Sequence, residues 1–237
     1  MRIAIISDIH GNFDALSALP RDYDQLWVLG DLVNYGPEPK PVIDFVRANA
    51  TLVLRGNHDH AVGRHQDPRC APPYKPLAEE TMVYTERILS DDDKRYLAEL
   101  PTFVERRIGA LEFLLCHATP SDALFGYRPA ESPEWDADLV NRGCDVLLAG
   151  HTHVPFQRTV NGRLVANPGS LGQPKTGNSN ACYALWEDGN FELRNYKYPV
   201  EMTIEKIGKI GLPPEIVRQL VNILRTGGEF AAPSTGN

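Results

Sequence analysis

The chain has 237 residues, 42% of them hydrophobic and 23% charged, and its 31 acidic and 24 basic side chains give a formal net charge of -7. This composition is typical of a globular protein, and the acidic balance argues against a protein that coats nucleic acid by neutralising its phosphates. A chain of this length buries roughly 70–75% of its unfolded surface on folding. We therefore expect it to fold without a disulfide or structural metal, so that any bound metal would serve function.

The first residues and the spacing of the cysteines indicate the cellular compartment in which we expect the protein. Polar residues follow the first apolar run at once, which predicts no signal peptide, and no apolar stretch approaches the length of a transmembrane helix. The four cysteines lie far apart and form no CxxC pair; they are Cys70, Cys116, Cys144 and Cys182. We interpret them as reduced thiols and the protein as cytoplasmic, with no membrane association.

Short apolar runs in the first part of the chain each end in a loop rich in Gly, Asp, Asn or His. Such near-continuous hydrophobicity is typical of strands that are buried on both faces. The runs cover residues 3–7, 25–29, 51–54, 111–116 and 145–149. Helical patterns cover residues 13–19, 38–48, 77–89 and 90–100; Asn12 caps the first, and a capping box of Ser90 and Asp93 opens the last. The alternation predicts a layered α/β architecture.

The pattern changes after His153. Residues 156–160, 163–167, 181–187 and 191–198 are predicted to be strands, and Asn161-Gly162 and Asp188-Gly189 are strong signals for tight hairpin turns. We therefore expect antiparallel pairing in this half. An amphipathic helix is predicted over 213–226.

The domain organisation follows from the absence of an internal repeat or linker. We expect a single domain over residues 1–226, with insertions near 64–89 and 120–142, and a flexible tail over 227–237. Both insertions follow loops that carry polar candidate site residues, and such positions commonly hold lids and specificity elements.

Histidines and loop carboxylates gather after the predicted strands. The residues are His10, His58, His117, His151 and His153, together with Asp8, Asp31 and Asn57. Ligands of a layered α/β site collect in this way at the carboxyl ends of neighbouring strands. Imidazole nitrogens with carboxylate and amide oxygens suit manganese, iron, zinc or nickel better than magnesium alone.

Five short blocks occur in a fixed order along the chain. They are Asp8-Ile9-His10, Gly30-Asp31, Gly56-Asn57-His58-Asp59, Cys116-His117 and Gly150-His151-Thr152-His153. This order resembles the calcineurin-like metallophosphoesterase superfamily, most closely its small prokaryotic members of the phosphodiesterase and diadenosine-tetraphosphatase type, and the resemblance extends from Arg2 to about Tyr198. It implies a four-layer αββα sandwich with two central mixed β-sheets and metal-dependent phosphoesterase activity.

The resemblance also implies a dinuclear metal centre. One ion would be bound by Asp8, His10 and His153, a second by Asn57, His117 and His151, and Asp31 would bridge them. The ions would be divalent or trivalent transition metals, with manganese expected and iron, zinc or nickel as alternatives. A hydroxide held between such ions would attack phosphorus in line, because metal ions lower the pKa of bound water to about 7.

Further residues match the family outside the ligand set. His58 corresponds to the family's histidine that does not bind metal, and it would protonate the leaving group, with Asp59 orienting its imidazole. Arg55 matches an arginine of the protein-phosphatase branch and would touch the substrate together with Asn57 and His58. Tyr35 stands where that branch has a phosphate-clamping arginine, which argues against a phosphoprotein phosphatase.

Three functions stay open on the sequence. The first is hydrolysis of a small phosphodiester, monoester or dinucleoside polyphosphate. The second is a catalytically silent scaffold on the same fold, although all ligand positions and His58 are retained. The third, a nuclease, is disfavoured because the acidic composition does not suit a polymeric nucleic acid. The expected partner is a small phosphate ester or nucleotide-like molecule, and homo-oligomerisation is left open.

Overall fold

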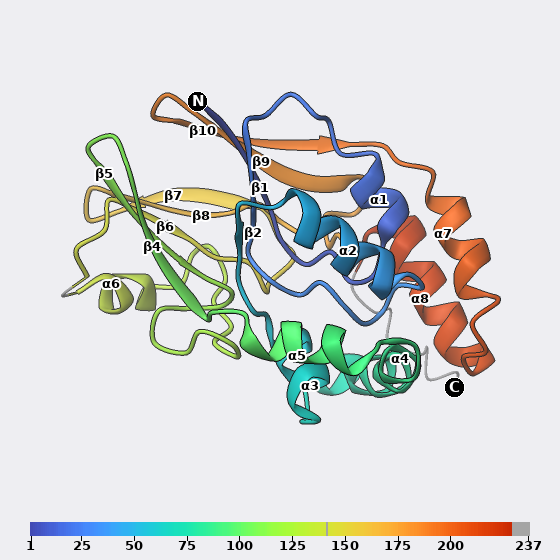
Figure 1. Cartoon of the computed structure of the whole chain (residues 1–237). Coiled ribbons are helices and arrows are strands. Elements are labelled where there is room, and N and C mark those ends of the chain that lie inside the picture. Colours follow the sequence, from blue (N-terminus) through green and yellow to red (C-terminus); the bar gives the residue numbers. More distant parts are fainter. Residues whose placement is uncertain (141, 229–237) are drawn as a thin grey trace, which may run out of the picture.

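Two five-stranded β-sheets form the centre of the molecule (Figure 1). The computed structural model describes residues 1–140 and 142–228. The first sheet has the order β10-β9-β1-β2-β3 and the second the order β4-β5-β6-β8-β7. The strands of the first sheet are β1 (Arg2–Ile6), β2 (Gln25–Val28), β3 (Leu52–Val53), β9 (Ala181–Glu187) and β10 (Asn190–Tyr196). Those of the second are β4 (Phe103–Ile108), β5 (Leu111–Cys116), β6 (Val146–Leu148), β7 (Phe156–Val160) and β8 (Arg163–Asn167).

Both sheets are mixed. In the first, β1, β2 and β3 are parallel, β9 pairs antiparallel with β1, and β10 pairs antiparallel with β9. In the second, β5, β6 and β8 are parallel, and β4 and β7 pair antiparallel at the two edges. The parallel strands therefore end at a common edge of each sheet.

Alternating side chains of β1 explain why its sequence is apolar throughout. Ile3 and Ile5 face the second sheet and pack in one cluster with Phe113 of β5, whereas Ala4 and Ile6 face the other way, into a cluster with helical residues. Trp27, Phe113 and Trp186 make edge-to-face ring contacts within the cluster between the sheets, at centroid distances of 5.7 and 4.9 Å. A strand between two cores has no solvent face, so no polar alternation appears in its sequence.

Helices cover the outer faces of both sheets (Figure 1). The helices α1 (Phe13–Ser17) and α2 (Pro39–Asn49) pack on the first sheet, and α6 (Glu134–Leu139) packs on the second. The remaining helices are α3 (Asn57–Arg64), η1 (Pro72–Tyr74), α4 (Lys75–Ile88), α5 (Asp91–Glu99), α7 (Val200–Ile207) and α8 (Pro214–Thr226). The predicted four-layer αββα sandwich is confirmed, with a thin outer layer over the second sheet.

Several elements differ from the prediction. The sequence analysis did not predict α3, α7 or β4. The first turn of α3 is Asn-His-Asp-His, which resembles a polar loop, and β4 is an edge strand with no fully buried side chain, so it lacks an apolar run. The antiparallel expectation for the second half holds for β7 with β8 and β9 with β10, but β8 pairs with β6 in parallel.

The C-terminal end of the described chain is packed. Gly227 ends α8 with a φ of 58°, is buried, and accepts a 2.6 Å hydrogen bond from the amide of Gly177. The rest of the expected tail, residues 229–237, lies outside the described residues. Among the helices of the described chain, none combines the length and the apolar character that crossing a membrane requires.

Candidate metal centre

Loops that follow the carboxyl ends of strands in both sheets bring seven polar side chains together. They are Asp8 and His10 after β1, Asp31 after β2, Asn57 at the start of α3, His117 after β5, and His151 and His153 after β6. Six of the seven are buried, and His151 is partly exposed. The structure therefore gathers all of the residues that the sequence analysis expected to bind metal.

The backbone holds five of these residues in the left-handed region. The φ angles are 53° for Asp8, 49° for His10, 57° for Asp31, 67° for His151 and 62° for His153. Each such residue costs about 1–3 kcal/mol, and such residues cluster at functional sites. Amide hydrogen bonds hold the loops in place: the Asp8 amide donates to the Gly30 carbonyl at 3.0 Å, and the His10 amide donates to the Asp31 carbonyl at 2.9 Å.

Asp8, His10 and His153 form one group of candidate ligands. Asp8 Oδ1 lies 3.3 Å from His153 Nε2 and 4.0 Å from His10 Nε2. Asp8 Oδ2 accepts a hydrogen bond from the amide of His151, whereas Oδ1 is buried and has no hydrogen-bond partner among the described residues. A buried carboxylate oxygen without a donor is costly unless a cation lies beside it.

Three imidazoles of the centre share one orientation, with Nδ1 close to a backbone carbonyl. The pairs are His10 with Val33 at 3.0 Å, His117 with Leu29 at 2.8 Å and His153 with Gln173 at 2.8 Å. Because a carbonyl only accepts, Nδ1 carries the proton of the neutral ring, and Nε2 presents a lone pair to the centre. The Nε2 atoms of His10 and His153 are 3.1 Å apart, a separation that suits a shared cation.

Asp31 lies between the first group and a second one. Its Oδ2 is 3.8 Å from His10 Nε2 and 3.3 Å from His117 Nε2. Its Oδ1 accepts a 2.8 Å hydrogen bond from the amide of His58. A Cβ atom at Gly56 would lie 2.0 Å from Asp31 Oδ1, so this approach requires glycine.

Asn57 completes the second group with His117 and His151. Its Oδ1 is 3.2 Å from His117 Nε2 and 3.1 Å from His151 Nδ1. Its Nδ2 donates to the Pro68 carbonyl at 2.8 Å, which directs the amide oxygen toward the imidazoles. This amide therefore offers a metal its oxygen.

Burial and charge set the protonation of the centre. Burial lowers the pKa of His10 and of His151 to about 3. Burial also opposes the imidazolium of His117, but the Asp31 and Asp8 carboxylates outweigh it and raise its pKa to about 9. For both aspartates burial opposes ionisation, and the neighbouring imidazoles outweigh it, so that each pKa lies below its ordinary value. The centre thus offers two ionised carboxylates.

These donors fit a pair of transition-metal ions. Two groups whose ligand atoms lie within 4.8 Å of one another are Asp8 with His10 and His153, and Asp31 with His117 and His151. Mixed imidazole and carboxylate donors suit first-row transition metals. A third group contains His10, Asp31 and His58.

His58 has partners of its own. Its Nδ1 lies 2.9 Å from Asn34 Nδ2, and its Nε2 lies 3.4 Å from Cys70 Sγ. Burial lowers the pKa of His58, but the electrostatic effects of Cys70 and Asp31 and the hydrogen bond with Cys70 outweigh burial and raise this pKa to about 9. Because both ring nitrogens have partners other than the carboxylates, we treat His58 as separate from the ligand set.

Asp59 does not orient His58, contrary to the expectation from the sequence. Its Oδ2 accepts hydrogen bonds from the amides of Asp31 at 2.8 Å and Gly56 at 3.0 Å, and its Oδ1 accepts one from the amide of Leu32 at 2.8 Å. Both oxygens are thereby engaged by backbone. Asp59 therefore fixes the loop that carries Asp31 against the start of α3, and Asn34 takes the place expected for it beside His58.

Arg55 also differs from the expectation that it touches the substrate. Its guanidinium donates to the Ala98 carbonyl at the end of α5, and its backbone amide donates to the Pro101 carbonyl at 2.8 Å. These contacts stabilise the C-terminal end of a helix. Arg55 does not line the cavity that contains the candidate ligands.

A family model described as the calcineurin-like phosphoesterase superfamily domain matches residues 1–188. The chain belongs to this superfamily. It is therefore a hydrolase that acts on phosphoric esters, as the five ordered blocks indicate. The metallophosphoesterase fold of the two mixed sheets agrees with this family.

Individual relatives support the same assignment. An uncharacterized protein of Methanocaldococcus jannaschii is 30% identical over 234 residues, covering 89% of this chain and 93% of the relative. The crystal structure of a metallophosphoesterase from Sphaerobacter thermophilus has a TM-score of 0.79 at 28% identity, covering 93% of this chain and 98% of that one. A symmetrical bis(5'-nucleosyl)-tetraphosphatase of Vibrio parahaemolyticus is 30% identical over 60% of this chain. The match spans about half (49%) of that tetraphosphatase.

The phosphoesterase centre opens into a cavity of about 560 Å³. Asp31, Asn57, His58, His151 and His153 form its inner end. The walls come from the loops between α3 and α4, between β5 and α6, and between β8 and β9. Parts of the two segments that the sequence analysis expected as insertions, 64–89 and 120–142, therefore contribute to the cavity wall.

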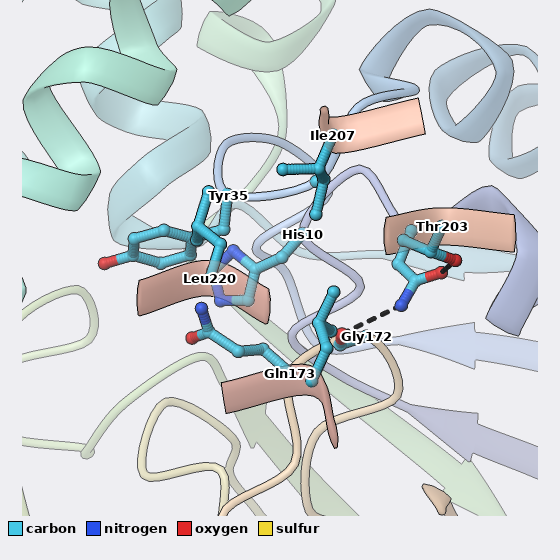
Figure 2. Close-up of a pocket in the computed structure, with 10 residues that line it drawn as sticks. His10, Tyr35, Gly172, Gln173, Thr203, Ile207 and Leu220 are labelled. Carbon is cyan, nitrogen blue, oxygen red and sulfur yellow. Dashed lines mark hydrogen bonds between the residues drawn. The ribbon is translucent and has the colours of Figure 1, made fainter. Parts of the chain in front are cut away.

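Helices beyond the family match support the centre from behind. His10 and Tyr35 line a cavity of about 10 Å³ together with Ile207 of α7 and Leu220 of α8. Figure 2 labels these four side chains. The rings of His10 and Tyr35 meet edge to face at 4.8 Å. The Asn12 amide donates to the Gly172 carbonyl at 2.9 Å, drawn as a dashed line. The phosphoesterase centre thus rests on residues from the far end of the chain.

Sequence reasoning missed Asn34, Cys70 and Gln173 as residues of the site. Asn34 lies three residues after Asp31 in the same loop, so its proximity to the block was an available signal. Cys70 belongs to the insertion expected near residues 64–89, and Gln173 lies in the loop between β8 and β9. Neither of these two has a local pattern that distinguishes it from an ordinary loop residue.

Proposed function

We propose that this phosphoesterase binds two transition-metal ions and hydrolyses a small phosphate ester or nucleotide-like substrate. Asp8, His10 and His153 would hold one ion, Asn57, His117 and His151 the other, and Asp31 would contact both. Manganese is the first candidate, and iron, zinc or nickel are alternatives for the same donors. His58 would protonate the leaving group.

One observation carries the proposal for metal. Asp8 Oδ1 is buried without a hydrogen-bond donor, 3.3 Å from the inward Nε2 of His153. The Nε2 atom of His10 lies 3.1 Å from that of His153 and 4.0 Å from Asp8 Oδ1. Three electron-pair donors directed at one point are unfavourable together unless a cation binds there.

Metal ions bound there would lower the pKa of a bound water and offset charge on the phosphoryl group. The chain's own groups then have separate tasks. Asp31 lies between the two ligand groups, so its position sets their separation. The carbonyls of Val33, Leu29 and Gln173 hold the imidazoles in the orientation that presents Nε2 inward.

His58 acts on the leaving group. It lines the cavity beside Asp31, and the side chain of Asn34 holds its Nδ1 at 2.9 Å. This contact leaves Nε2, which lies 3.4 Å from Cys70 Sγ, as the atom that would deliver a proton to the leaving oxygen as the bond between phosphorus and oxygen breaks. The imidazole then recovers a proton from solvent. General acid catalysis of this kind contributes about 10²–10⁴-fold to rate.

The substrate class follows from the cavity and the relatives. A volume of about 560 Å³ lies within the range of roughly 300–1,000 Å³ that is typical of small-molecule sites. Similarity to symmetrical bis(5'-nucleosyl)-tetraphosphatases supports a dinucleoside polyphosphate as the specific substrate. Simple phosphodiesters and monoesters remain the alternatives to test beside it.

The test is hydrolysis of bis-p-nitrophenyl phosphate by protein that is stripped of metal and resupplied with manganese. The monoester p-nitrophenyl phosphate serves as the comparison, and metal content is measured in parallel. We expect activity to require metal, and His58→Ala to lower kcat by about 10²–10⁴-fold while metal content is retained. Loss of both metals in His58→Ala would overturn the separate role of His58. Failure of the native protein to bind metal would favour the silent scaffold.

A further inference from the structure

Two cationic side chains lie at the walls of the cavity, away from the candidate ligands. Arg69 comes from the loop between α3 and α4, and Lys175 comes from the loop between β8 and β9. Each lies against an aromatic ring of another wall: Arg69 over Phe125 at 4.5 Å and Lys175 over Tyr74 at 4.3 Å. We call these four residues the cation–aromatic rim.

Arg69 occupies a backbone position that disfavours its side chain. Its φ is 54°, in the region that glycine adopts without cost and other residues rarely do. Its backbone amide donates to Asp67 Oδ1 at 2.7 Å, which stabilises the turn without using the guanidinium. Among the described residues, no carboxylate pairs with Arg69. Within the described residues the guanidinium lies over the Phe125 ring and forms no ion pair, so it can still bind an anion.

The position of Arg69 is tied to the metal centre. The preceding residue, Pro68, accepts the Asn57 amide hydrogen bond at 2.8 Å, and the following residue, Cys70, lies 3.4 Å from His58 Nε2. The loop is thus connected on both sides of Arg69 to residues at the inner end of the cavity. A group held at a fixed distance from the reacting phosphate suits recognition of a neighbouring part of the same substrate.

The charges at the rim contrast with the rest of the protein. The chain has a net charge of -7, and the inner end of the cavity carries Asp31. Arg69 and Lys175, which come from two different loops of the cavity wall, therefore create a local attraction for anions in an otherwise acidic molecule. Phe125 and Tyr74, together with Tyr127, which is 56% exposed, add aromatic surface beside these charges.

We propose that the cation–aromatic rim selects nucleotide substrates that carry at least one phosphate besides the one that is hydrolysed. Arg69 and Lys175 would bind the additional phosphate, and the aromatic side chains would contact the base. Arginine suits the bidentate recognition of phosphate, and aromatic rings stack on any base. This inference rests on the proposed phosphoesterase function of the inner end of the cavity.

The experiment compares a substrate that has a second phosphate and a base with one that has neither. Diadenosine tetraphosphate and bis-p-nitrophenyl phosphate serve as the two, with manganese-loaded protein. The variants are Arg69→Gly, Lys175→Ala and their combination. Arg69→Gly suits the left-handed backbone, so we expect its thermal midpoint to equal or exceed that of the native protein. Arg106→Ala, at an exposed position in β4, is the matched control for loss of a positive charge.

We expect each single variant to lower kcat/KM for diadenosine tetraphosphate by about tenfold and the combination by about a hundredfold, mainly through KM. Hydrolysis of bis-p-nitrophenyl phosphate should stay within about twofold of native, as should both activities of Arg106→Ala. Equal losses of kcat/KM for both substrates, or no loss for diadenosine tetraphosphate, would overturn the proposed role of the cation–aromatic rim.

Binding provides a readout that does not depend on turnover. Calorimetric titration with the non-hydrolysable adenosine 5'-(β,γ-imido)triphosphate should show a weaker Kd in the rim variants, and the difference should be much smaller for AMP. If native protein loaded with manganese hydrolyses neither substrate, the proposed function fails, and the titration still decides the rim. Identical Kd values for native protein and the combined variant would then exclude phosphate binding by the cation–aromatic rim.

Discussion

The inner end and the mouth of the same cavity are built in different ways. At the inner end, the buried side chains come from loops that follow strand ends, and hydrogen bonds to neighbouring groups hold them in place. For example, His10 Nδ1 donates to the Val33 carbonyl at 3.0 Å. At the mouth, Arg69 and Tyr127 are exposed and extend from long loops. Ring contacts contribute to the packing there, such as that of Arg69 with Phe125 at 4.5 Å.

This difference assigns the chemical reaction to the inner end of the cavity and substrate recognition to its mouth. Groups that must bind metal tolerate little displacement, and the sheets and their hydrogen bonds keep them rigid. Groups that recognise the remainder of a substrate can vary with the loops, because loop changes do not disturb the sheets. Substitutions at the inner end should therefore alter metal content or kcat, and those at the mouth should alter KM for particular substrates.

The largest effect is expected from Asp31→Asn. Asp31 Oδ2 lies 3.8 Å from His10 Nε2 and 3.3 Å from His117 Nε2, so under the proposed function its replacement would remove charge from both ions' surroundings. Activity should fall by about a thousandfold or more, since metal ions supply several kcal/mol of charge stabilisation. Metal content by mass spectrometry should fall too, whereas Arg69→Gly should keep it. An Asp31→Asn protein with full metal content would show that Asp31 is not shared.

A second prediction concerns Asp59, which supports the inner end without lining the cavity. Its carboxylate accepts three backbone hydrogen bonds, and its side chain is fully buried. Asp59→Asn would direct an amide N–H group at backbone N–H donors, so we expect a loss of about 2–3 kcal/mol in the free energy of unfolding. Denaturant titration measures this change. Unchanged stability together with a large loss of kcat would instead restore the role of Asp59 beside His58.

A third prediction tests whether Asn34 positions His58. Asn34→Ala removes the contact at Nδ1, so the imidazole should lose its fixed orientation and kcat should fall by about 10–100-fold. Metal content and KM should stay near native, because Asn34 is outside the ligand groups. Partial rescue by Asn34→Gln, which keeps an amide N–H donor for Nδ1, would distinguish positioning from packing. A loss of metal in proportion to the loss of kcat would contradict the positioning role of Asn34.

The sequence was sufficient to predict the fold family and the gathering of the candidate ligands. Each ligand lies within a few residues of a strand end, and parallel strands end together, so local pattern and topology agree. Arg55 could not be predicted in this way, because its direction depends on where α5 ends, and Ala98 is far along the chain. The contact of Cys70 with His58 likewise depends on the path of an irregular loop.

The smallest expected effect lies far from the cavity and separates folding from metal loss at acid pH. Asp93 opens α5 in a capping box with Ser90. Burial opposes ionisation of Asp93, but hydrogen bonds from Ser90 and the charges of Lys40 and Arg47 outweigh it and hold its pKa below the usual 3.8. Its contribution to stability is therefore complete above the unfolded pKa and is lost as pH falls through the folded one. Asp93→Asn should lower the free energy of unfolding by about 1 kcal/mol at pH 6, and this difference should shrink below pH 4.

The metal content of Asp93→Asn should match that of the native protein at every pH, because acid would release metal by protonating the candidate ligands at the inner end of the cavity, which Asp93 does not contact. If Asp93→Asn instead lost metal at a higher pH than native, the inner end would depend on α5, and its rigidity could not be assigned to the strand-end loops alone.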